Sequence, residues 1–342
     1  MILAAGAGER ARPLTADIPK ALVNVAGGTL LEWNLKNYCL AGVQEVTIAI
    51  GYMASMIEDY LRSGQQRNDC EQDINVVVVR DYEIGPLRTA LTALETFSDE
   101  AFFISPVDTI IDSETIKEML DRSASLKGMI LAVDYNANTG TPVYVDKGGL
   151  IVGLGDPKPE GEFSVGRSVM LLIANRIIVD YCRSALLRNE NRLVQVLNRM
   201  IKDGIPLYSH EIHTEWFDID TLSDVLLLNR HLLESAALDD IKRGVFIPNG
   251  DLMQIGDRLE LRDSDVVLNT NVHLQGPVLI SPGCRIAQGC RIGPNVTIGS
   301  AASISDNCDL INTIVYSKST IDAHSHIENA IVYGSQVYHV EL

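Results

Sequence analysis

The hydrophobic positions of this 342-residue chain follow two different periods. Up to about residue 235, short apolar runs typical of buried strands alternate with stretches whose apolar residues recur every three to four positions, as in amphipathic helices. This alternation predicts a largely parallel sheet flanked by helices. The predicted strands cover residues 2–4, 46–50, 74–79, 101–104 and 129–133, and the predicted helices cover 30–40, 53–61, 87–97 and 113–122.

From about residue 266 the apolar positions recur every six residues, which no helix can produce. The repeated large residues are Leu268, Leu274, Ile280, Ile286, Ile292, Ile298, Ile304 and Leu310, and a small or branched residue lies two positions before each of them. This period is typical of a parallel β-helix, here of roughly four coils, and it slips by one residue at Val315. The chain is therefore divided into an α/β domain (1–235), a linker (236–265) and a β-helix domain (266–342).

Composition and charge narrow the classes of function. The net charge of −17 and the pI near 4.8 argue against a general nucleic-acid-binding role, which needs a basic surface. No apolar run approaches the roughly 20 residues of a membrane span, and the first residues do not resemble a signal peptide, so we expect a cytoplasmic protein without membrane partners. The six cysteines lack zinc-ligand spacing, so we expect reduced thiols. Those within the six-residue repeat (Cys284, Cys290 and Cys308) are predicted to be packing residues.

A glycine-containing loop, LAAGAGERARPLT from residue 3 to 15, follows the first predicted strand. Its glycines permit a tight turn in which successive backbone N–H groups converge on one anion. Arg10 adds a guanidinium and Lys20 a compact ammonium, so the segment suits a triphosphate. Glycines at a strand-to-helix turn can also be purely structural, and G-x-G alone would leave that reading open.

The loop together with the following IPKALVNVAGGTLLEWNL resembles the signature of the sugar-1-phosphate nucleotidyltransferases, the NDP-sugar pyrophosphorylases, with a C-terminal left-handed β-helix. The resemblance implies a Rossmann-like, mixed-sheet nucleotidyltransferase domain followed by a left-handed parallel β-helix of hexapeptide repeats. It also implies the activity: a nucleoside triphosphate and a sugar 1-phosphate give a nucleoside-diphosphate sugar and pyrophosphate. The loop residues then implied to bind nucleotide are Leu3, Ala5, Gly6, Ala7 and Gly8.

In that family the arginine matching Arg10 stabilises the leaving pyrophosphate, and the lysine matching Lys20 contacts the reacting phosphates. Transfer between two anions needs charge neutralisation, and Mg²⁺ held by carboxylates supplies it. Asp108 follows the strand AFFIS, Asp218 lies in WFDIDT, and each resembles a metal-ligand position of the family, with Asp108 also catalytic. A lone aspartate in such a place is commonly a turn or cap residue, and Asp220 is interpreted as the N-cap of a helix that begins near residue 222.

The base and sugar sides match the family less closely. Residues 83–90, EIGPLRTA, resemble the base-reading element, which implies nucleotide contacts at Glu83, Pro86, Arg88 and Thr89; Glu83 as a solvated surface acid is the alternative. Arg88 stands where the family has glycine. On the sugar side, DPKP resembles an E-K-P element and makes Lys158 the candidate for the sugar phosphate, with Ser168 beside it. Neither the base nor the sugar is identified.

Two other functions stay open. Departures from the family pattern at Arg88, Pro142 and Ser168 would also fit a non-catalytic regulatory paralogue that senses a nucleotide sugar. His324 and His326, on a predicted turn of the β-helix, could act as bases in an additional amino-sugar acetyltransferase. Association into a homo-oligomer through the β-helix is the role we expect of that domain.

Overall fold

The structure is a computed structural model that describes residues 1–63, 71–97, 101–126, 128–235, 245–248, 250–261 and 264–342. The chain forms two compact units that alternate along the sequence. The first, the α/β unit, contains Met1–Gly8, Ile18–Leu22 and Leu30–Asp218. The second, the solenoid unit, contains Glu9–Asp17, Val23–Thr29 and Ile219–Leu342. The N-terminal motif is therefore shared between the units in five consecutive segments.

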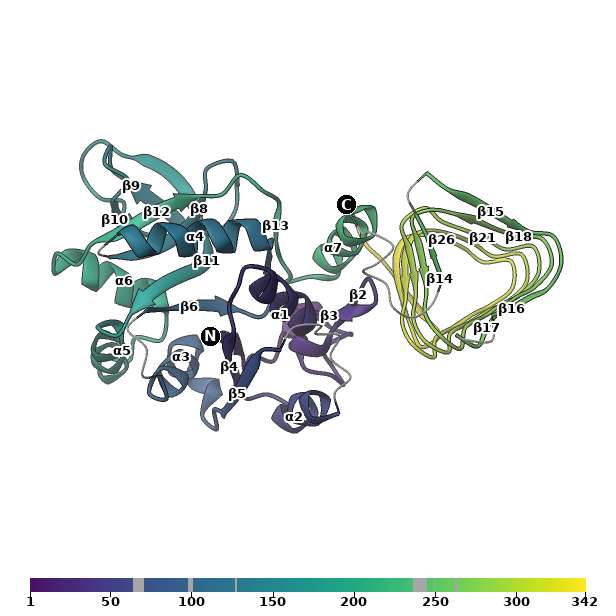
Figure 1. Ribbon diagram of the computed structural model, residues 1–342, viewed down its shortest axis with the longest axis horizontal. Helices are drawn as coiled ribbons and strands as arrows, with labels where there is room; N and C mark the ends of the chain where they lie inside the picture. Colours follow the sequence, from purple (N-terminus) through teal and green to yellow (C-terminus); the bar gives the residue numbers. More distant parts are fainter. Residues whose placement is uncertain (64–70, 98–100, 127, 236–244, 249, 262–263) are drawn as a thin grey trace. The chain divides into compact units, whose positions relative to one another are not determined.

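The sheet of the α/β unit is mixed, as predicted, with the strand order β10-β9-β11-β6-β1-β4-β5 (Figure 1). Strand β1 is central and runs parallel to β4 on one side and β6 on the other. Strand β11 runs antiparallel to β6, β8 and β9, and β12 joins β8 in parallel. The bounds are β1 Ile2–Ala4, β4 Glu45–Ile50, β5 Asp73–Val78, β6 Ala101–Pro106, β8 Met129–Asp134, β9 Pro142–Val145, β10 Ile151–Leu154, β11 Ser164–Asn175 and β12 Leu207–Glu211.

Helices cover both faces of this sheet, so the unit has three layers. Leu91 of α3, Cys182 of α5 and Met200 of α6 belong to one hydrophobic core. Leu35 of α1 and Ile116 of α4 belong to the other core, on the opposite face. The helices are α1 Leu30–Leu40, α2 Ala54–Arg62, α3 Pro86–Leu94, α4 Ser113–Ser125, α5 Ile178–Leu187 and α6 Leu193–Lys202. The five strands and four helices expected from periodicity are confirmed, with ends that differ by a few residues.

The solenoid unit contains a β-helix with strands on three faces (Figure 1). Equivalent residues lie 18 positions apart in the first coils, as in Val267, Arg285 and Ser303, and 17 apart between Ser303 and Thr320. The shorter coil has two residues between Leu310 and Thr313, where the preceding coil has three between Ile292 and Val296. This shorter corner is the source of the one-residue slip seen at Val315. The strands are β17 Val266–Leu268, β18 Val272–Gln275, β19 Val278–Ile280, β20 Arg285–Ile286, β21 Arg291–Ile292, β22 Val296–Ile298, β23 Ser303–Ile304, β24 Asp309–Val315, β25 Thr320–Ile321 and β26 His326–Tyr333.

The repeated apolar residues fill the β-helix core as predicted, and the three cysteines of the repeat are at most 1% exposed. Each thiol donates to a corner carbonyl, from Cys284 to Gly299, from Cys290 to Ser305 and from Cys308 to Asp322, at 3.1 to 3.2 Å. Burial raises the pKa of Cys290 to about 11, so this thiol is structural rather than nucleophilic. Cys39 is disulfide-bonded, which corrects the expectation of reduced thiols at that residue; spacing along a sequence does not reveal which thiols the fold brings together. Cys70 lies outside the described residues.

Helix α7 (Leu222–Ser235) packs against one face of the β-helix, through β24 and β26. On that face Leu279, Thr297 and Ile331 alternate with core residues, so they point away from the core. They are nevertheless at most 2% exposed. Helix α7 covers this face, and the hairpin β2 (Asn24–Val25) to β3 (Gly28–Thr29), which contacts α7, belongs to the same unit.

Two polar contacts fix the hairpin within the solenoid unit. Asn229 of α7, fully buried, accepts hydrogen bonds through Oδ1 from the backbone N–H of Ala26 at 3.1 Å and from Thr297 Oγ1 at 2.7 Å. The Tyr316 hydroxyl donates to the Asn24 carbonyl at 2.8 Å. A buried amide with two partners from different segments is costly to disturb, so these contacts make the hairpin part of the solenoid core.

Antiparallel strands cover the first coil of the β-helix. Strands β14 (Val245–Ile247), β15 (Leu252–Ile255) and β16 (Leu259–Leu261) pair with β19, β18 and β17, and they lie in the range predicted as a linker. Residues 236–244, 249 and 262–263 of that range lie outside the described residues. After the last coil, β27 (Gln336–His339) pairs antiparallel with β26. Covered edges of this kind limit uncontrolled strand pairing.

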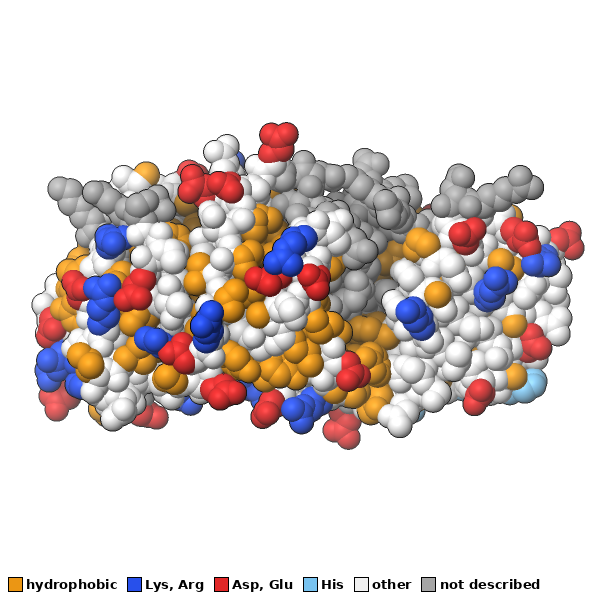
Figure 2. Space-filling model, turned by 90° about the horizontal axis from the view of Figure 1, so that it is seen from below, with side chains coloured by type: hydrophobic (Ala, Val, Ile, Leu, Met, Phe, Trp, Pro, Cys, Tyr) orange, Lys and Arg blue, Asp and Glu red, His pale blue; other side chains and the backbone are white. Residues whose placement is uncertain are grey.

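The surfaces of the two units differ. On the face in Figure 2, hydrophobic side chains gather over the α/β unit, whose exposed apolar residues include Val76 and Val78 of the edge strand β5. The β-helix carries isolated apolar side chains among polar ones. Among the described helices, none is long and apolar enough to cross a bilayer. The cytoplasmic location and the association through the β-helix stay predictions.

Candidate active site

The site is built at the carboxyl edge of the parallel strands. Strand β1 leads into the glycine loop, and β6 leads into Asp108, so both arrive at the same edge. The loop is held at its start, because the carbonyls of Leu3 and Ala5 accept hydrogen bonds from Val107 N–H and Tyr52 N–H at 2.9 and 3.0 Å. Gly6 is exposed with open space around it.

Gly8 is required by both its backbone and its neighbour. Its φ of +61° lies in the left-handed region, and a Cβ atom placed on it would lie 3.0 to 3.2 Å from three carbons of the Lys20 side chain. Glycine therefore lets the loop turn while the lysine stem passes directly beside it. This close approach brings Gly8 and Lys20 together although they are 12 positions apart in the sequence.

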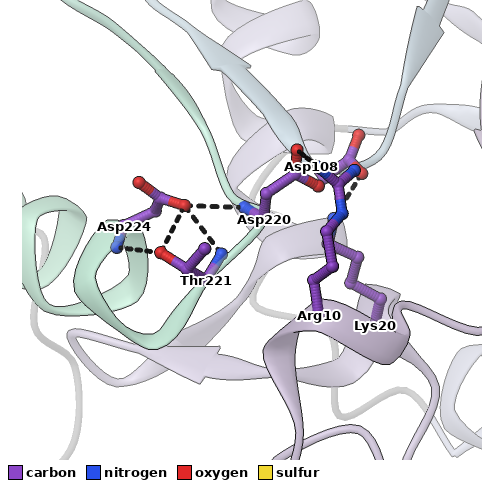
Figure 3. Close-up of polar contacts among 6 residues, drawn as sticks. All are labelled: Arg10, Lys20, Asp108, Asp220, Thr221 and Asp224. Atoms are coloured by element: carbon purple, nitrogen blue, oxygen red, sulfur yellow. Dashed lines mark hydrogen bonds and ion pairs between the residues drawn. The ribbon is translucent and has the colours of Figure 1, made fainter. Parts of the chain in front are cut away.

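Lys20 is a nearly buried ammonium paired with Asp108. The residue begins the 3-10 helix η2 (Lys20–Leu22), is 7% exposed, and places Nζ 2.5 Å from Asp108 Oδ2 (Figure 3). Burying an ammonium is costly unless it is paired, so the contact fixes both side chains in place. It also joins two residues 88 positions apart, of which Lys20 was predicted to contact the phosphates and Asp108 to bind the metal.

Asp218 is brought to the same place by a short strand pair. Strand β7 (Thr109–Ile111) starts directly after Asp108, and β13 (Trp216–Asp218) pairs with it antiparallel, with Asp218 opposite Thr109. One carboxylate oxygen of Asp108 and one of Asp218 lie within 4.8 Å of each other. The two predicted metal ligands are therefore adjacent within the α/β unit.

The donor set fits a hard divalent cation. Two carboxylates supply oxygen ligands, and Mg²⁺ commonly takes one or two protein carboxylates while phosphate oxygens and water complete its shell. Asp108 is 23% exposed at its side chain and Asp218 is exposed, so both stay accessible to a ligand from solvent. The pair is therefore suited to holding a divalent cation.

Arg10 lies in the solenoid unit, in the 3-10 helix η1 (Glu9–Ala11), with a largely exposed side chain. Its guanidinium pairs with Asp220 of the same unit at 2.8 Å (Figure 3). The N-cap prediction for Asp220 is wrong. Asp224 Oδ2 accepts from the backbone N–H of Asp220 and Thr221, and Asp224 N–H donates to Thr221 Oγ1, so Thr221 caps α7. The Asp220 carboxylate is engaged by the guanidinium instead.

The base-reading element forms a turn and the start of a helix. Glu83 lies exposed in η3 (Tyr82–Ile84), Pro86 is the first residue of α3, and Thr89 is buried in its first turn. Arg88, which replaces a glycine of the family, places Nε 2.6 Å from Asp81 Oδ2. The side chain is thus tied to the turn that precedes the helix.

The two residues predicted on the sugar side lie around β11. Ser168 is buried on that strand, where its Oγ accepts from the Met170 N–H at 3.2 Å. Lys158 is exposed between β10 and β11, with Nζ 5.0 Å from the centroid of the Phe163 ring, a cation–π contact. Ser168 is therefore occupied by its own strand, whereas Lys158 is a solvent-facing cation.

Two aspartates that the sequence analysis did not single out contact the segment that leads to Asp218. Asp134, the last residue of β8, accepts from the Trp216 indole N–H at 2.8 Å. Asp112, the N-cap of α4, is bonded to Thr115 and Thr214. Burial favours a higher pKa for Asp112, but the hydrogen bonds from both threonines outweigh it and hold the pKa below its usual value. The sequence could have indicated that Asp134 ends a strand. It could not have indicated that Asp134 is the hydrogen-bond partner of Trp216.

Comparison with known proteins agrees with this geometry. Residues 1–152 match the MobA-like NTP transferase domain, and residues 274–338 match the GMPPB C-terminal domain. An N-acetylmuramate alpha-1-phosphate uridylyltransferase of Caulobacter vibrioides is 34% identical over 113 residues, 32% of this chain and 45% of the relative. A UTP–glucose-1-phosphate uridylyltransferase of Synechocystis is 24% identical over 66% of this chain and 60% of the relative. A mannose-1-phosphate guanyltransferase beta-A of Xenopus laevis is 26% identical over 66% and 62%.

The chain spans 45% to 62% of the length of these relatives. The inositol-1-phosphate CTP transferase of T. maritima shares the fold, with a TM-score of 0.56 and 20% identity over 69% of this chain and 96% of that structure. The relatives are nucleotidyltransferases that act on sugar 1-phosphates by their names, and the motifs of the glycine loop and the two aspartates resemble the same group. The chain is therefore similar to sugar-1-phosphate nucleotidyltransferases, with a match to the MobA-like NTP transferase domain followed by a match to the GMPPB C-terminal domain.

Proposed function

We propose that this chain is a Mg²⁺-dependent nucleotidyltransferase that forms a nucleoside-diphosphate sugar and pyrophosphate from a nucleoside triphosphate and a sugar 1-phosphate. The observation that carries the proposal is the adjacency of Lys20, Asp108 and Asp218 beside the glycine loop. These residues come from three distant segments, and each lies in a sequence motif that resembles one of the family. A purely structural loop would not require a buried ammonium and two neighbouring carboxylates at its side.

The chemistry is an in-line displacement. An oxygen of the sugar phosphate attacks the α-phosphorus, the bond to the β-phosphate breaks, and pyrophosphate leaves with that bond's electron pair. No protein nucleophile is needed, so positioning and charge supply the rate. Asp108 and Asp218 would hold Mg²⁺, which would supply neutralisation of phosphate charge. Lys20, held by Asp108, presents a fixed ammonium to the phosphates, and the open backbone at Gly6 gives them access to the loop amides.

The regulatory alternative rests on departures such as Arg88, and the geometry weakens that argument. The Arg88 side chain is tied to Asp81, which holds the guanidinium to the turn. Lys158 stays exposed and available to an anion, in keeping with its predicted role at the sugar phosphate. The base and the sugar are to be identified by experiment.

The test is a matrix of the common triphosphates against several sugar 1-phosphates with Mg²⁺, with pyrophosphate release as the signal. We expect one combination to turn over, and we expect Asp108→Asn to lower its rate by about 10³-fold, because the variant loses a metal ligand and the partner of Lys20. A matched control is Asp180→Asn, since Asp180 pairs with Arg183 on the exposed face of α5, far along the chain from the motifs. Binding of a nucleotide sugar without pyrophosphate release in any combination would favour the regulatory function.

A further inference from the structure

Asp134 ends strand β8 with a carboxylate whose two oxygens are both engaged. Oδ1 accepts from the backbone N–H of Asn136 at 2.7 Å and of Ala137 at 3.1 Å, and this closes the turn after the strand. Oδ2 accepts from Trp216 Nε1 at 2.8 Å. A carboxylate fixed by two amides is a rigid acceptor, so the indole is held at a defined position relative to β8.

Trp216 is the first residue of β13, and Asp218 is the third. Successive side chains of a strand alternate between faces, so the indole and the Asp218 carboxylate point to the same side of the β7–β13 pair. The strand has only three residues and pairs with β7, itself three residues long. Such a pair has few backbone hydrogen bonds, and a ring held at one end therefore restricts the rotation and sliding of the whole strand.

A second contact secures the segment before β13. The Thr214 hydroxyl donates to Asp112, which is itself bonded to Thr115 in α4. This contact acts on the chain entering β13, two residues before Trp216, whereas Asp134 acts on the side of the strand that carries Asp218. Loss of Asp134 would therefore leave the segment attached while the strand becomes free to shift.

We propose that Asp134 is a positioning residue, which holds the Asp218 carboxylate at metal-binding distance from Asp108 through the indole N–H of Trp216. The inference rests on the proposed function, because it takes Asp108 and Asp218 as the metal ligands. Residues that orient metal ligands from outside the coordination shell typically change metal affinity by about 10- to 100-fold when they are removed. Since Asp134 acts through a neighbouring residue, we expect the lower end of that range.

The test measures Mn²⁺ binding to the full chain, without nucleotide, from the loss of the free-ion EPR signal. Asp134→Asn replaces one acceptor oxygen with an NH₂ group, so one of the N–H groups of Asn136, Ala137 and Trp216 would face a second donor. Trp216→Phe removes the indole N–H donor and keeps an aromatic ring. Each variant should raise the dissociation constant by about 10-fold. The double variant should be no weaker than either single one, because both changes remove one interaction. A product of the two effects, about 100-fold, would show independent roles and overturn the proposal.

Asp146→Asn is the matched control. Asp146 also closes a turn after a strand, with Oδ1 accepting from Gly148 N–H and Leu150 N–H at 2.8 and 2.9 Å, so the change disturbs a similar turn. We expect Mn²⁺ affinity within twofold of the parent chain. Equal affinity of Asp134→Asn and the parent would overturn the proposal while the proposed enzyme stands. If the parent and Asp108→Asn both bind Mn²⁺ equally, the metal assignment fails, and the proposal fails with it.

A structural readout separates positioning from general loosening. Indole N–H signals in NMR spectra come from Trp33 and Trp216, and Trp216→Phe identifies the second by its loss. Asp134→Asn should shift the Trp216 signal upfield, as expected when a charged acceptor is lost, and should leave the Trp33 signal in place. Movement of both signals, together with a broad loss of dispersion, would mean that the variant misfolds. In that case Trp216→Phe alone decides, because an unchanged Mn²⁺ affinity in that variant overturns the proposal.

Discussion

The two units obtain their structure in opposite ways. In the solenoid, a residue meets the partner that lies 18 or 17 positions further along, and the same contact recurs in each coil. In the α/β unit, the side chains of the site meet across long stretches of chain, as Lys20 and Asp108 do across 88 positions. The solenoid therefore distributes its stability over many similar contacts, whereas the site concentrates its chemistry in a few contacts that nothing else repeats.

This difference predicts different consequences of substitution. A change at the site should reduce activity far more than stability, because the few residues involved contribute little to the core. A change in the solenoid core should reduce stability by an amount that is similar at equivalent positions. The four predictions below test this contrast, from the largest expected effect to the smallest.

Replacing Gly8 by alanine should lower the turnover rate by about 100-fold. Displacing a catalytic group by about 1 Å typically has an effect of this size. The new Cβ would lie 3.0 Å from the Lys20 Cβ and must displace the lysine stem, and φ at +61° is strained for alanine. Steady-state pyrophosphate release measures the loss. Gly149→Ala is the control, since Gly149 has φ +80° with open space around it. Equal activity losses in both variants would mean that backbone strain, not the contact with Lys20, is responsible.

Replacing Asn229 by alanine should destabilise the solenoid unit by about 3 kcal/mol, because Ala26 N–H and Thr297 Oγ1 lose their shared acceptor in a buried place. Thr297→Val removes only one donor and should cost about 1 kcal/mol. Urea unfolding followed by circular dichroism gives both values. A loss below 1 kcal/mol for the alanine variant would show that the solenoid depends on its repeats alone, which sharpens the contrast between the units.

The three repeat cysteines should behave alike. Changing Cys284, Cys290 or Cys308 to alanine removes a buried sulfur that donates to a corner carbonyl, at a cost of about 1 kcal/mol each. Thermal unfolding of the single variants measures this, and the values should agree within about 0.5 kcal/mol. Widely different costs would contradict the view that equivalent solenoid positions are energetically equivalent.

His210 gives the smallest expected effect. Burial lowers its pKa, the Arg122 guanidinium lowers it further, the Glu118 carboxylate opposes both, and His213 contributes weakly. Because the folded pKa lies below the unfolded value, the unfolded state takes up the proton first, and stability falls as pH drops below about 6.5. Between pH 7.5 and 5.5, the parent should therefore lose more stability than His210→Gln. Parallel melting temperatures at both pH values would contradict this.

The repeated and strongly periodic parts of the fold could be predicted from the sequence. The six-residue period located the β-helix and even its shorter coil, and the apolar runs located β1, β4, β5, β6 and β8, because buried strands and amphipathic faces leave a direct hydrophobic pattern. The pattern did not reveal β11, whose 12 residues form the link between the parallel and antiparallel parts of the sheet. Its role depends on three partners far along the chain, which local periodicity does not encode.

In the candidate site, too, the sequence predicted the residues that lie in local motifs and missed the contacts that depend on distant partners. Lys20, Asp108 and Asp218 were predicted because each lies in a recognisable motif, and they lie close together in the structure. Asp134 was missed because its partner is a tryptophan 82 positions away. Asp220 was misread because a helix start in the sequence suggests a cap, whereas the residue that takes the role is decided by the position of Asp224. The nucleotide and sugar contacts assigned to Glu83, Pro86, Thr89, Lys158 and Ser168 stay predictions.

The sharing of residues 9–17 and 23–29 with the solenoid has a practical consequence for anyone who wishes to shorten this protein. An expression product that stops after α7 would leave Asn24 without Tyr316, would leave Asn229 without Thr297, and would expose an apolar helix face to water. We therefore expect a chain trimmed at the end of the Rossmann-like fold to be destabilised. The last third of the gene is part of what any working truncation must retain.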